Sequence, residues 1–410
     1  MADKTKILWI GDGGAATGFA RVNHSIIENL SPTKYEIHHL AVNYMGDPYK
    51  TKKHHKLYPA MQAKNYGDFM GVNRVLELIN EVNPDLVFIL NDPWAVPQYL
   101  TRIPASIKIV VYTPVDAKPV LRSWAEVLNR VNRLVTYTEF GKEAYLEAFP
   151  EMDNLAVIPH GVDTDTFYDI SRSEARKAVG LPEDLFVVFN GNRNQPRKRI
   201  DLTLRAFAKF AEGKDDVRLL LNMGEVDAGW NLKVLADRLG ILPKVILTKK
   251  DFTPQNYLSD ETLNLVYNAA DVGINTSLGE GWGLINVEQA CCRVAQIVPN
   301  SSACAEIFPD DSCLKIDVVD YMYHPDIMTE GQIISVDNLV EHLNTYYYDR
   351  NLLEKHSNAV YEHFTSPELQ WKTIAKQWDK LFKKVLKEDP KALLLLEQEG
   401  KIEIERKKEE

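Results

Sequence analysis

The chain has 410 residues, more than one hydrophobic core usually fills, so we expect two domains with a crevice between them. A formal net charge of −10 and a pI of about 5.6 argue against a protein that coats nucleic acids in general. The four cysteines lie in one stretch from Cys291 to Cys313 and form no CxxC pair, which predicts reduced, buried thiols instead of a disulfide framework or a zinc site.

Short apolar runs alternate with amphipathic helical patterns in the first part of the chain. Helical patterns lie at 18–30 and 70–82. The apolar runs are typical of strands buried on both faces, and they lie at 6–12, 36–43, 85–92, 108–116, 133–139 and 155–161. This alternation is typical of βαβ units and predicts a parallel sheet.

The same alternation restarts after a polar, turn-rich segment at 162–173. The second series of apolar runs lies at 185–191, 217–224, 244–249, 271–277 and 295–300. We therefore predict two Rossmann-like domains, one over residues 1–165 and one over residues 166–368. Residues 387–410 form a charged tail, and its KIEIERKKEE end at 401–410 is expected to fray in solvent.

The N-terminus passes from MADKTK directly into the first apolar run, without the longer apolar stretch of a signal peptide. No apolar run approaches the roughly 20 residues that a membrane span needs. We expect a cytoplasmic protein with no transmembrane segment.

A glycine-rich loop, GDGGAATGFARV, follows the first predicted strand. Gly11, Gly13 and Ala16 fit the G-x-G-x-x-[G/A] fingerprint of dinucleotide-binding domains. That fingerprint also needs an acidic residue at the end of the second strand, where this chain has Asn43. Three interpretations stay open: NAD or FAD binding, the least favoured; a structural turn; or backbone amides at Gly13 and Gly14 that bind a sugar or phosphate.

Positive charge is concentrated in NGNRNQPRKRIDL, directly after the first strand of the second series. Arg193 and Lys198 are joined by a proline-containing loop, with Arg197 and Arg199 beside them. Ligands of parallel sheets bind at the carboxyl ends of the strands. A diphosphate suits this loop, because arginine offers a planar fork and lysine a point charge. The alternative is a solvated basic loop.

A second glycine-rich turn, in NTSLGEGWGLINVEQA, runs into a helix-like segment at 275–290. Glycines let backbone N–H groups approach a ligand, and a helix start adds its positive end, so this turn suits an anion. Glu280 precedes the turn and Glu288 lies in the helix. Taken alone, a loop charge for Glu280 and an exposed helix carboxylate for Glu288 are the simpler interpretations.

Together these segments resemble the family 4 retaining glycosyltransferases of GT-B fold. An E-x7-E motif matches Glu280 and Glu288, and an R-x4-K pair matches Arg193 and Lys198. The resemblance covers most of the chain and extends to segments at 157–167, 193–207 and 267–284. It implies two Rossmann-like domains whose parallel sheets face a central cleft. It also implies a last helix, here about 369–385, that crosses back to the N-terminal domain.

The resemblance implies a retaining, hexosyltransferase-like enzyme that moves a sugar from a nucleotide-sugar donor to an acceptor hydroxyl. The donor would bind mainly to the C-terminal domain and the acceptor mainly to the N-terminal one. The nucleotide base, the sugar and the oligomeric state stay open, and the acceptor is a glycan, lipid, protein or small molecule. The alternatives are a non-catalytic sugar-nucleotide-binding subunit and an epimerase or phosphorylase of the same architecture.

Matching positions give the expected donor contacts. Arg193 and Lys198 would hold the diphosphate, and backbone N–H groups around Gly283 and Leu284 would share its oxygens. We expect no cofactor and no catalytic metal, since these cations take the metal's role.

The same matching assigns the carboxylates, which act here as hydrogen-bond acceptors. Glu288 would accept hydrogen bonds from the ribose and Glu280 would face the transferred sugar. Many family members have a histidine at the end of the strand that here is 108–116. This chain offers Asp116 there, either as a hydrogen-bond partner of the sugar or acceptor, or as a turn residue beside Pro114.

Three further features have simple interpretations, and the effect of a fourth stays open. The sequence Asp163-Thr-Asp165 resembles a metal-binding D-x-D motif but is interpreted as a turn. His160 is expected to order the domain junction. The basic run KTKKHHK at 50–56 is interpreted as a solvated loop, with an anionic acceptor, nucleic acid or membrane as the alternatives. Where the family commonly has E-A-x-A-C-G-x-P, this chain has Arg293 and Ala295 in place of glycine and proline, and the effect stays open.

Overall fold

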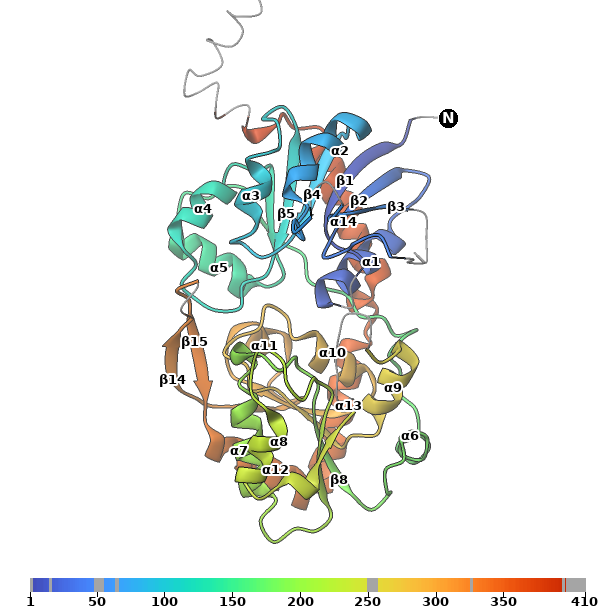
Figure 1. The fold of residues 1–410 in the computed structure, drawn as a ribbon, viewed down its shortest axis with the longest axis vertical. Helices are drawn as coiled ribbons and strands as arrows, with labels where there is room; N and C mark the ends of the chain where they lie inside the picture. Colours follow the sequence, from blue (N-terminus) through green and yellow to red (C-terminus); the bar gives the residue numbers. More distant parts are fainter. Residues whose placement is uncertain are drawn as a thin grey trace, which may run out of the picture. The chain divides into compact units, whose positions relative to one another are not determined.

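The computed structural model describes residues 3–14, 17–47, 55–62, 66–248, 257–324, 327–392 and 395. The chain forms two compact α/β units, each built on its own sheet (Figure 1). Unit 1 comprises residues 1–115, 119–161 and 371–410, and unit 2 comprises residues 116–118 and 162–370. The chain thus passes between the units four residues before the predicted boundary at 165, and residues 116–118 belong to unit 2.

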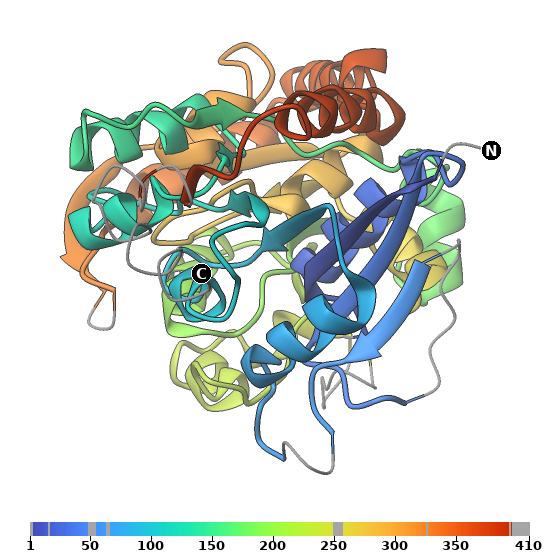
Figure 2. The ribbon, with the colours of Figure 1, turned by 90° about the horizontal axis from the view of Figure 1, so that it is seen from above.

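Unit 1 contains a seven-stranded parallel sheet in the order β3-β2-β1-β4-β5-β6-β7. Figure 2 shows β1 and β2 side by side in blue. The strands are β1 (Thr5–Asp12), β2 (Tyr35–Val42), β3 (His55–Pro59), β4 (Leu86–Leu90), β5 (Lys108–Thr113), β6 (Arg133–Thr136) and β7 (Leu155–Val157). The reversal of strand order between β1 and β4 is the Rossmann topology, in which ligands bind beyond the carboxyl ends of the strands.

The helices of unit 1 present apolar faces to this sheet. In α1, for example, the hydroxyl of Thr17 accepts a hydrogen bond from the Ala20 amide and caps the helix, and Val22 and Ile26 are buried. The helices are α1 (Gly18–Asn29), α2 (Val75–Val82), α3 (Val96–Leu100), α4 (Arg122–Leu128), α5 (Glu139–Ala148) and α14 (Trp371–Val385), with a 3₁₀ turn η2 (Val72–Arg74) before α2.

The last helix, α14, packs on unit 1 (Figure 1). Trp378 and Phe382 are fully buried, and both rings contact Phe88 of β4. The Tyr35 hydroxyl donates a hydrogen bond to Asp379 at 2.9 Å. Burial of a side chain such as Phe382 contributes about 1.5–3 kcal/mol. The predicted return of the last helix to the N-terminal domain is confirmed.

The first residues after α14 also dock on unit 1. Arg133 forms an ion pair with Glu388, and the Asn132 amide donates to the Asp389 carbonyl oxygen at 2.8 Å. Two polar side chains, one at the start of β6 and one just before it, thus hold the beginning of the charged tail. The end at 401–410, where fraying is expected, lies outside the described residues. Apart from residue 395, the chain from 393 onward lies outside the described residues.

Unit 2 contains a six-stranded parallel sheet in the order β10-β9-β8-β11-β12-β13. The strands are β8 (Phe186–Asn190), β9 (Val217–Leu221), β10 (Val245–Leu247), β11 (Val272–Ile274), β12 (Ala295–Pro299) and β13 (Leu314–Ile316). Its helices are α6 (Arg172–Val179), α7 (Ile200–Phe210), α8 (Leu232–Arg238), α9 (Asp260–Asn268), α10 (Leu284–Cys291), α11 (Ser302–Ile307), α12 (Val336–Tyr348) and α13 (Arg350–Phe364), with 3₁₀ turns η3 (Pro196–Lys198), η4 (Leu242–Lys244) and η5 (Pro367–Leu369). The prediction of two Rossmann-like domains is confirmed.

An antiparallel hairpin, β14 (Val318–Tyr323) and β15 (Glu330–Ile334), was not predicted (Figure 1). β15 binds two loops of unit 2 through its backbone. The Glu330 amide donates to the Lys118 carbonyl oxygen at 2.8 Å, and the Gln332 amide donates to Leu278 at 2.7 Å. The hairpin thereby fixes residues 116–118 next to the loop that contains Glu280.

Most of the observed strands end before the predicted runs do, although β1 ends at Asp12 as predicted. The apolar run 108–116 ends as a strand at Thr113, and the run 155–161 ends at Val157. The reason is that Val115 and Ile158, which follow these strands, are buried although they lie in loops. Within the described ranges, none of the helices is both long and apolar enough to cross a lipid bilayer.

Candidate active site

Lys198 is buried in the turn between β8 and α7 of unit 2. Its Nζ donates to Glu280 Oε1 at 2.6 Å. The Thr276 hydroxyl lies 3.0 Å from the carbonyl oxygen of Lys198 and 3.0 Å from that of Arg199, which ties the turn to the end of β11. Burial, followed by the nearby charge of Arg197, lowers the pKa of Lys198, whereas the charge of Glu280 acts in the opposite direction. The sequence motif therefore places a desolvated cation beside a carboxylate.

Glu280 is buried in the loop between β11 and α10. Besides Lys198, its Oε1 accepts from the Ser277 hydroxyl at 2.6 Å and from the Asn275 amide at 3.1 Å. Burial alone would raise the pKa of Glu280, but the charges of Lys198 and Arg197 outweigh it and lower the pKa to about 2. The side chain is therefore an anion at neutral pH. Asn275 and Ser277 were not predicted as site residues, although their place directly after β11 at the sheet edge marks them.

Arg197 joins Glu280 to Asp116. Its Nη1 donates to the Gly279 carbonyl oxygen at 2.8 Å and lies 3.0 Å from Asp116 Oδ2 and 3.9 Å from Glu280 Oε2. A Cβ atom at Gly279 would overlap the backbone of Asp116, so only glycine permits this approach. Asp116 was expected to be a residue of the N-terminal domain, but these contacts place it in unit 2.

Glu288 lies on α10, whereas Glu280 lies in the loop that precedes this helix. The Glu288 side chain is buried, and its Oε2 accepts from the Tyr267 hydroxyl at 2.9 Å. Gly283, with a φ of 86°, is the residue before the helix, and its carbonyl oxygen accepts from the Asn286 and Val287 amides at 3.0 and 3.2 Å. The first N–H groups of a helix generally have no intrahelical partner. The interpretation of Glu288 as an exposed helix carboxylate is wrong because its side chain is buried. Glu280 is a charge on a loop, as in its simpler interpretation, but its side chain is buried.

Arg193 lies on the same loop as Lys198, but its side chain is 65% exposed and its guanidinium group pairs elsewhere. Nε and Nη2 donate to the two carboxylate oxygens of Asp227, at 2.6 and 3.0 Å. The buried amide of Asn194 fixes the two loops to each other, since it donates to the Trp230 carbonyl oxygen and accepts from the Trp230 amide. The structure thus brings Lys198 to Glu280, whereas Arg193 faces a different carboxylate.

Gly13 and Gly14 belong to unit 1. A Cβ atom at Gly13 would lie 2.8 Å from both Ala41 and His39, and one at Gly14 would overlap the ring of Tyr44. These glycines are required for close packing, which supports the interpretation as a structural turn. A contact with sugar or phosphate stays a prediction. Ala16, the last residue of the fingerprint, lies outside the described residues.

The D-x-D sequence forms a turn, as predicted. The Asp163 carboxylate accepts from the backbone amides of Asp165 and Thr166 and from the Thr166 hydroxyl. Within the described ranges, no group of three or more His, Cys, Asp or Glu side chains is arranged to hold a metal ion. His160 is buried beside Tyr112, whose hydroxyl lies 2.7 Å from Nδ1, and burial lowers the pKa of His160 to about 3. This neutral imidazole lies at the end of the segment 119–161 of unit 1, next to the point where the chain passes to unit 2.

Two other predictions concern the thiols and the basic run. All four cysteines are buried and form no disulfide, which confirms the prediction of buried thiols. Residues 50–54 of the basic run lie outside the described residues. Its last two residues, His55 and Lys56, begin strand β3 and are not part of a loop.

Arg293 replaces the glycine of the family pattern at the end of α10, and its φ of 57° explains why glycine is common there. Its side chain forms three contacts that offset this backbone conformation. Nε donates to Asp169 at 2.7 Å, Nη1 donates to Asn358 at 2.7 Å, and the guanidinium group lies 3.7 Å from the centre of the Tyr361 ring.

Substitution of Arg293 tests this compensation. Arg293→Ala removes the three contacts and keeps a left-handed conformation that costs a side chain about 1–2 kcal/mol. Arg293→Gly removes the same contacts and relieves the conformation. We expect the glycine variant to unfold at a higher temperature than the alanine variant, measured by scanning calorimetry. A glycine variant that is less stable than the alanine variant would contradict this explanation.

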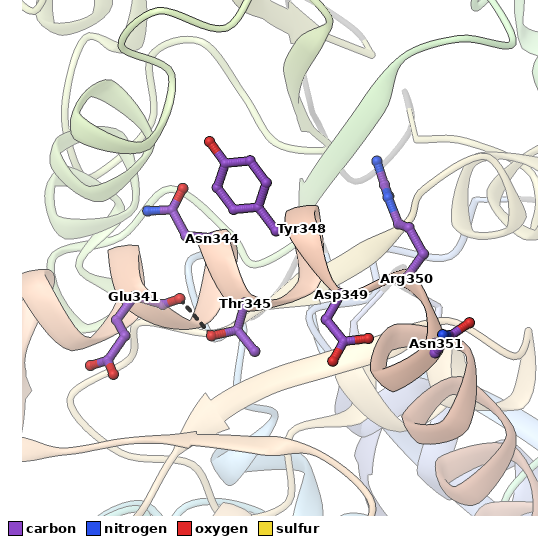
Figure 3. Close-up of a pocket in the computed structure, with 7 residues that line it drawn as sticks. All are labelled: Glu341, Asn344, Thr345, Tyr348, Asp349, Arg350 and Asn351. Atoms are coloured by element: carbon purple, nitrogen blue, oxygen red, sulfur yellow. Dashed lines mark hydrogen bonds between the residues drawn. The ribbon is translucent and has the colours of Figure 1, made fainter.

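A shallow groove elsewhere on unit 2 does not share these features (Figure 3). It lies where α12 meets α13, and the hydroxyl of Thr345 is used within α12, donating to the Glu341 carbonyl oxygen at 3.0 Å. It is lined by Glu341, Asn344, Thr345, Tyr348, Asp349, Arg350 and Asn351. Because none of these residues belongs to the Lys198–Glu280 cluster, the groove is not part of the candidate site.

Family models match both units. A model described as Glycosyltransferase Family 4 matches residues 16–166, and one described as glycosyl transferases group 1 matches residues 171–319. The chain belongs to glycosyltransferase family 4. Glu280, Lys198 and Arg193 all lie within the second matched region, so the cluster around Lys198 belongs to the family's C-terminal half.

The family 4 chain is similar to several named proteins. D-inositol 3-phosphate glycosyltransferase of Mycobacterium sp. (strain KMS) is 36% identical over 215 residues, which cover 50% of this chain and 46% of the relative. The protein of the same name from Mycolicibacterium smegmatis is 35% identical over 214 residues, covering 50% and 47%. The chain spans about half the length of the curated relatives it matches.

Solved structures of low sequence identity share the fold. Sucrose-phosphate synthase from Thermosynechococcus elongatus has a TM-score of 0.71 at 14% identity, covering 93% of this chain and 99% of that one. Anabaena HepE in complex with UDP and glucose has a TM-score of 0.69 at 17% identity, covering 93% and 100%. With these glycosyltransferase neighbours, the GT-B fold expected for family 4 is confirmed.

Proposed function

We propose that the protein is a retaining, hexosyltransferase-like enzyme that moves a sugar from a nucleotide-diphosphate-sugar donor to an acceptor hydroxyl without a catalytic metal. The observation that carries the proposal is the buried Lys198–Glu280 pair of unit 2. It joins a cation suited to a leaving phosphate and a carboxylate suited to sugar hydroxyls, within one hydrogen bond of 2.6 Å. A non-catalytic binding subunit has no need for a desolvated pair of this kind.

In this proposal the cations of unit 2 stabilise the departing diphosphate. Lys198 contributes a preorganised charge, and the amides at Gly283 and Leu284 contribute hydrogen bonds at the start of α10. Arg193 exchanges Asp227 for a phosphate oxygen. This exchange is feasible because an exposed ion pair such as Arg193–Asp227 is worth only about 0–1 kcal/mol.

Retention of configuration needs no strong side-chain base. The bond between the anomeric carbon and the phosphate oxygen breaks, and the acceptor oxygen forms its bond to the same face of that carbon. The acceptor proton passes to the leaving phosphate oxygen. Glu280 accepts hydrogen bonds from the sugar during this step, whereas Glu288, oriented by Tyr267, holds the ribose.

The acceptor class stays open, and two printed names suggest where to begin. HepE was solved with UDP-glucose, and the mycobacterial relatives are named for D-inositol 3-phosphate. A first panel therefore combines UDP-, GDP- and ADP-sugars with inositol phosphate, glycan and lipid acceptors. We assign the enzyme to the cytoplasm, since four thiols without a disulfide suit a reducing compartment.

Thermal shift with the donor panel tests the proposal directly. A ligand at one hundred times its dissociation constant adds about 2.7 kcal/mol to the stability of the folded protein. We expect one nucleotide class to raise the melting temperature and to support release of the nucleoside diphosphate with one acceptor. A protein that is stabilised by none of the nucleotide sugars would contradict the proposal.

Chelation is the second arm of the same experiment. Turnover should survive excess EDTA, because Lys198 and Arg193 neutralise the diphosphate in place of a metal. A complete loss of turnover that Mn²⁺ restores would instead make Asp163 and Asp165 candidates for metal ligands.

A further inference from the structure

Two charged residues outside the E-x7-E and R-x4-K motifs meet at the candidate site. Asp116 and Arg197 are far apart in the sequence, yet Asp116 Oδ2 lies 3.0 Å from Arg197 Nη1. The same nitrogen donates to the Gly279 carbonyl oxygen and lies 3.9 Å from Glu280 Oε2. The guanidinium group of Arg197 thus lies beside both the backbone and the carboxylate of the loop that contains Glu280.

The segment that contains Asp116 is fixed on unit 2 at several points. The Asp116 backbone lies against Gly279 so closely that no side chain fits there. Two residues later, the Lys118 carbonyl oxygen accepts from the Glu330 amide of β15 at 2.8 Å. The Asp116–Arg197 pair is therefore built into the framework of the site and is not a chance contact between mobile surface side chains.

The two oxygens of Glu280 have different surroundings. Oε1 takes the short hydrogen bonds from Lys198, Ser277 and Asn275. Oε2 faces Arg197 at 3.9 Å, beyond hydrogen-bond length. Arg197 therefore supports the charge on Oε2 without forming a hydrogen bond to it. Within the described residues Oε2 accepts no other hydrogen bond, so its lone pairs can accept one from a sugar hydroxyl.

We propose that Arg197, oriented by Asp116, is a positioning residue that keeps Oε2 of Glu280 as a charged acceptor for the transferred sugar. The inference rests on the proposed function. In this inference Asp116 acts by orienting Arg197 and not by contacting the acceptor hydroxyl.

Loss of Arg197 has a defined electrostatic consequence. A carboxylate that loses one of two nearby cations is easier to protonate, so the pKa of Glu280 rises. In the part of the chain that the structure describes, the charged or titratable groups facing Glu280 are Lys198 and Arg197 from η3, Asp116 behind Arg197, and the Cys304 thiol from α11. With Arg197 removed, Lys198 is the one cation of this set. The protonated, inactive fraction of Glu280 then grows at a higher pH than in the wild type.

Steady-state kinetics over a donor series and a pH series test the inference with Arg197→Gln, Arg197→Lys and Asp116→Asn. Arg205→Gln, an exposed arginine on α7, is the matched control for loss of one positive charge. We expect Arg197→Gln to lower kcat about tenfold with a smaller change in donor KM, as for a contact made mainly in the transition state. The acid limb of the pH dependence of kcat should move to higher pH by about half a unit or more in this variant, as expected for loss of a neighbouring charge.

The companion variants complete the test. Arg197→Lys should restore part of kcat, Arg205→Gln should match the wild type, and the double variant of Asp116 and Arg197 should be no worse than Arg197→Gln alone. An unmoved acid limb, additive losses in the double variant, or an Arg197→Gln variant that equals the control would each overturn the inference. A wild-type protein without donor binding or transfer would instead overturn the proposed function, so the two failures are distinguishable.

Discussion

Replacement of Lys198 by alanine should lower kcat by roughly 10²- to 10³-fold, the loss seen when one preorganised donor to a developing negative charge is removed. The Nζ of Lys198 is buried and lies 2.6 Å from Glu280, so water cannot readily replace its charge. The variant should still fold, because Ser277, Asn275 and Arg197 continue to surround the Glu280 carboxylate. Single-turnover kinetics at saturating donor, with circular dichroism as the folding control, give the measurement.

Arg193→Ala is the matched deletion of a cation on the same loop. The exposed Arg193 pairs with Asp227 and must change partner before it contacts a phosphate. We therefore expect its loss to lower turnover less than the loss of Lys198 does, and to weaken donor binding more. Turnover close to the wild-type value in both Lys198→Ala and Arg193→Ala would contradict the assignment of the diphosphate site to this loop.

The second large effect separates the two glutamates. Glu280→Ala should lower kcat more than it raises donor KM, because the charge on the sugar ring develops only as the bond to the diphosphate breaks. Glu288→Ala should mainly raise donor KM, because contacts with the ribose are alike in the ground state and the transition state. Kinetics of both variants over a donor concentration series measure the difference.

Tyr267→Phe provides the control for Glu288. It removes the hydroxyl that donates to Glu288 Oε2 at 2.9 Å and leaves the ring in the core. Donor KM should rise less than in Glu288→Ala, with kcat close to that of the wild type. Identical changes of kcat and KM in the two glutamate variants would contradict the separate roles given to Glu280 and Glu288. Unchanged kinetics in both variants would contradict the assignment of the donor site to this part of the chain.

Most strands of both sheets were predictable because parallel strands covered on both faces are continuous apolar runs. The hairpin was not, since Tyr321 and Tyr323 of β14 are exposed and the strand has no buried apolar face that a period of two would reveal. The short strands β3 and β13 also escaped detection. The ends of the predicted strands were wrong wherever a buried apolar residue continued the run into a loop, as at Val115.

The motif residues of the site were predictable, but their partners were not. Lys198 and Glu280 match motifs of the family that the sequence resembles, and the structure joins them. The partners of Arg193 and Arg197 are Asp227 and Asp116, which lie on loops distant in sequence, and no local pattern links an arginine to a carboxylate of another loop. Such pairings depend on the tertiary fold, which fixes each loop through buried backbone contacts such as those of Gly279.

Residues 116–118 lie in the sequence between parts of unit 1 but belong to unit 2. Unit 2 is therefore not a contiguous, exchangeable module. A fragment of residues 162–370 retains the six-stranded sheet and both sequence motifs but lacks the carboxylate that pairs with Arg197 and the carbonyl oxygen that binds β15. A chimera that joins this C-terminal half to the N-terminal half of another family member inherits a foreign segment at this position. Donor specificity transplanted between relatives should accordingly need the three residues that follow Val115 as well as the C-terminal half.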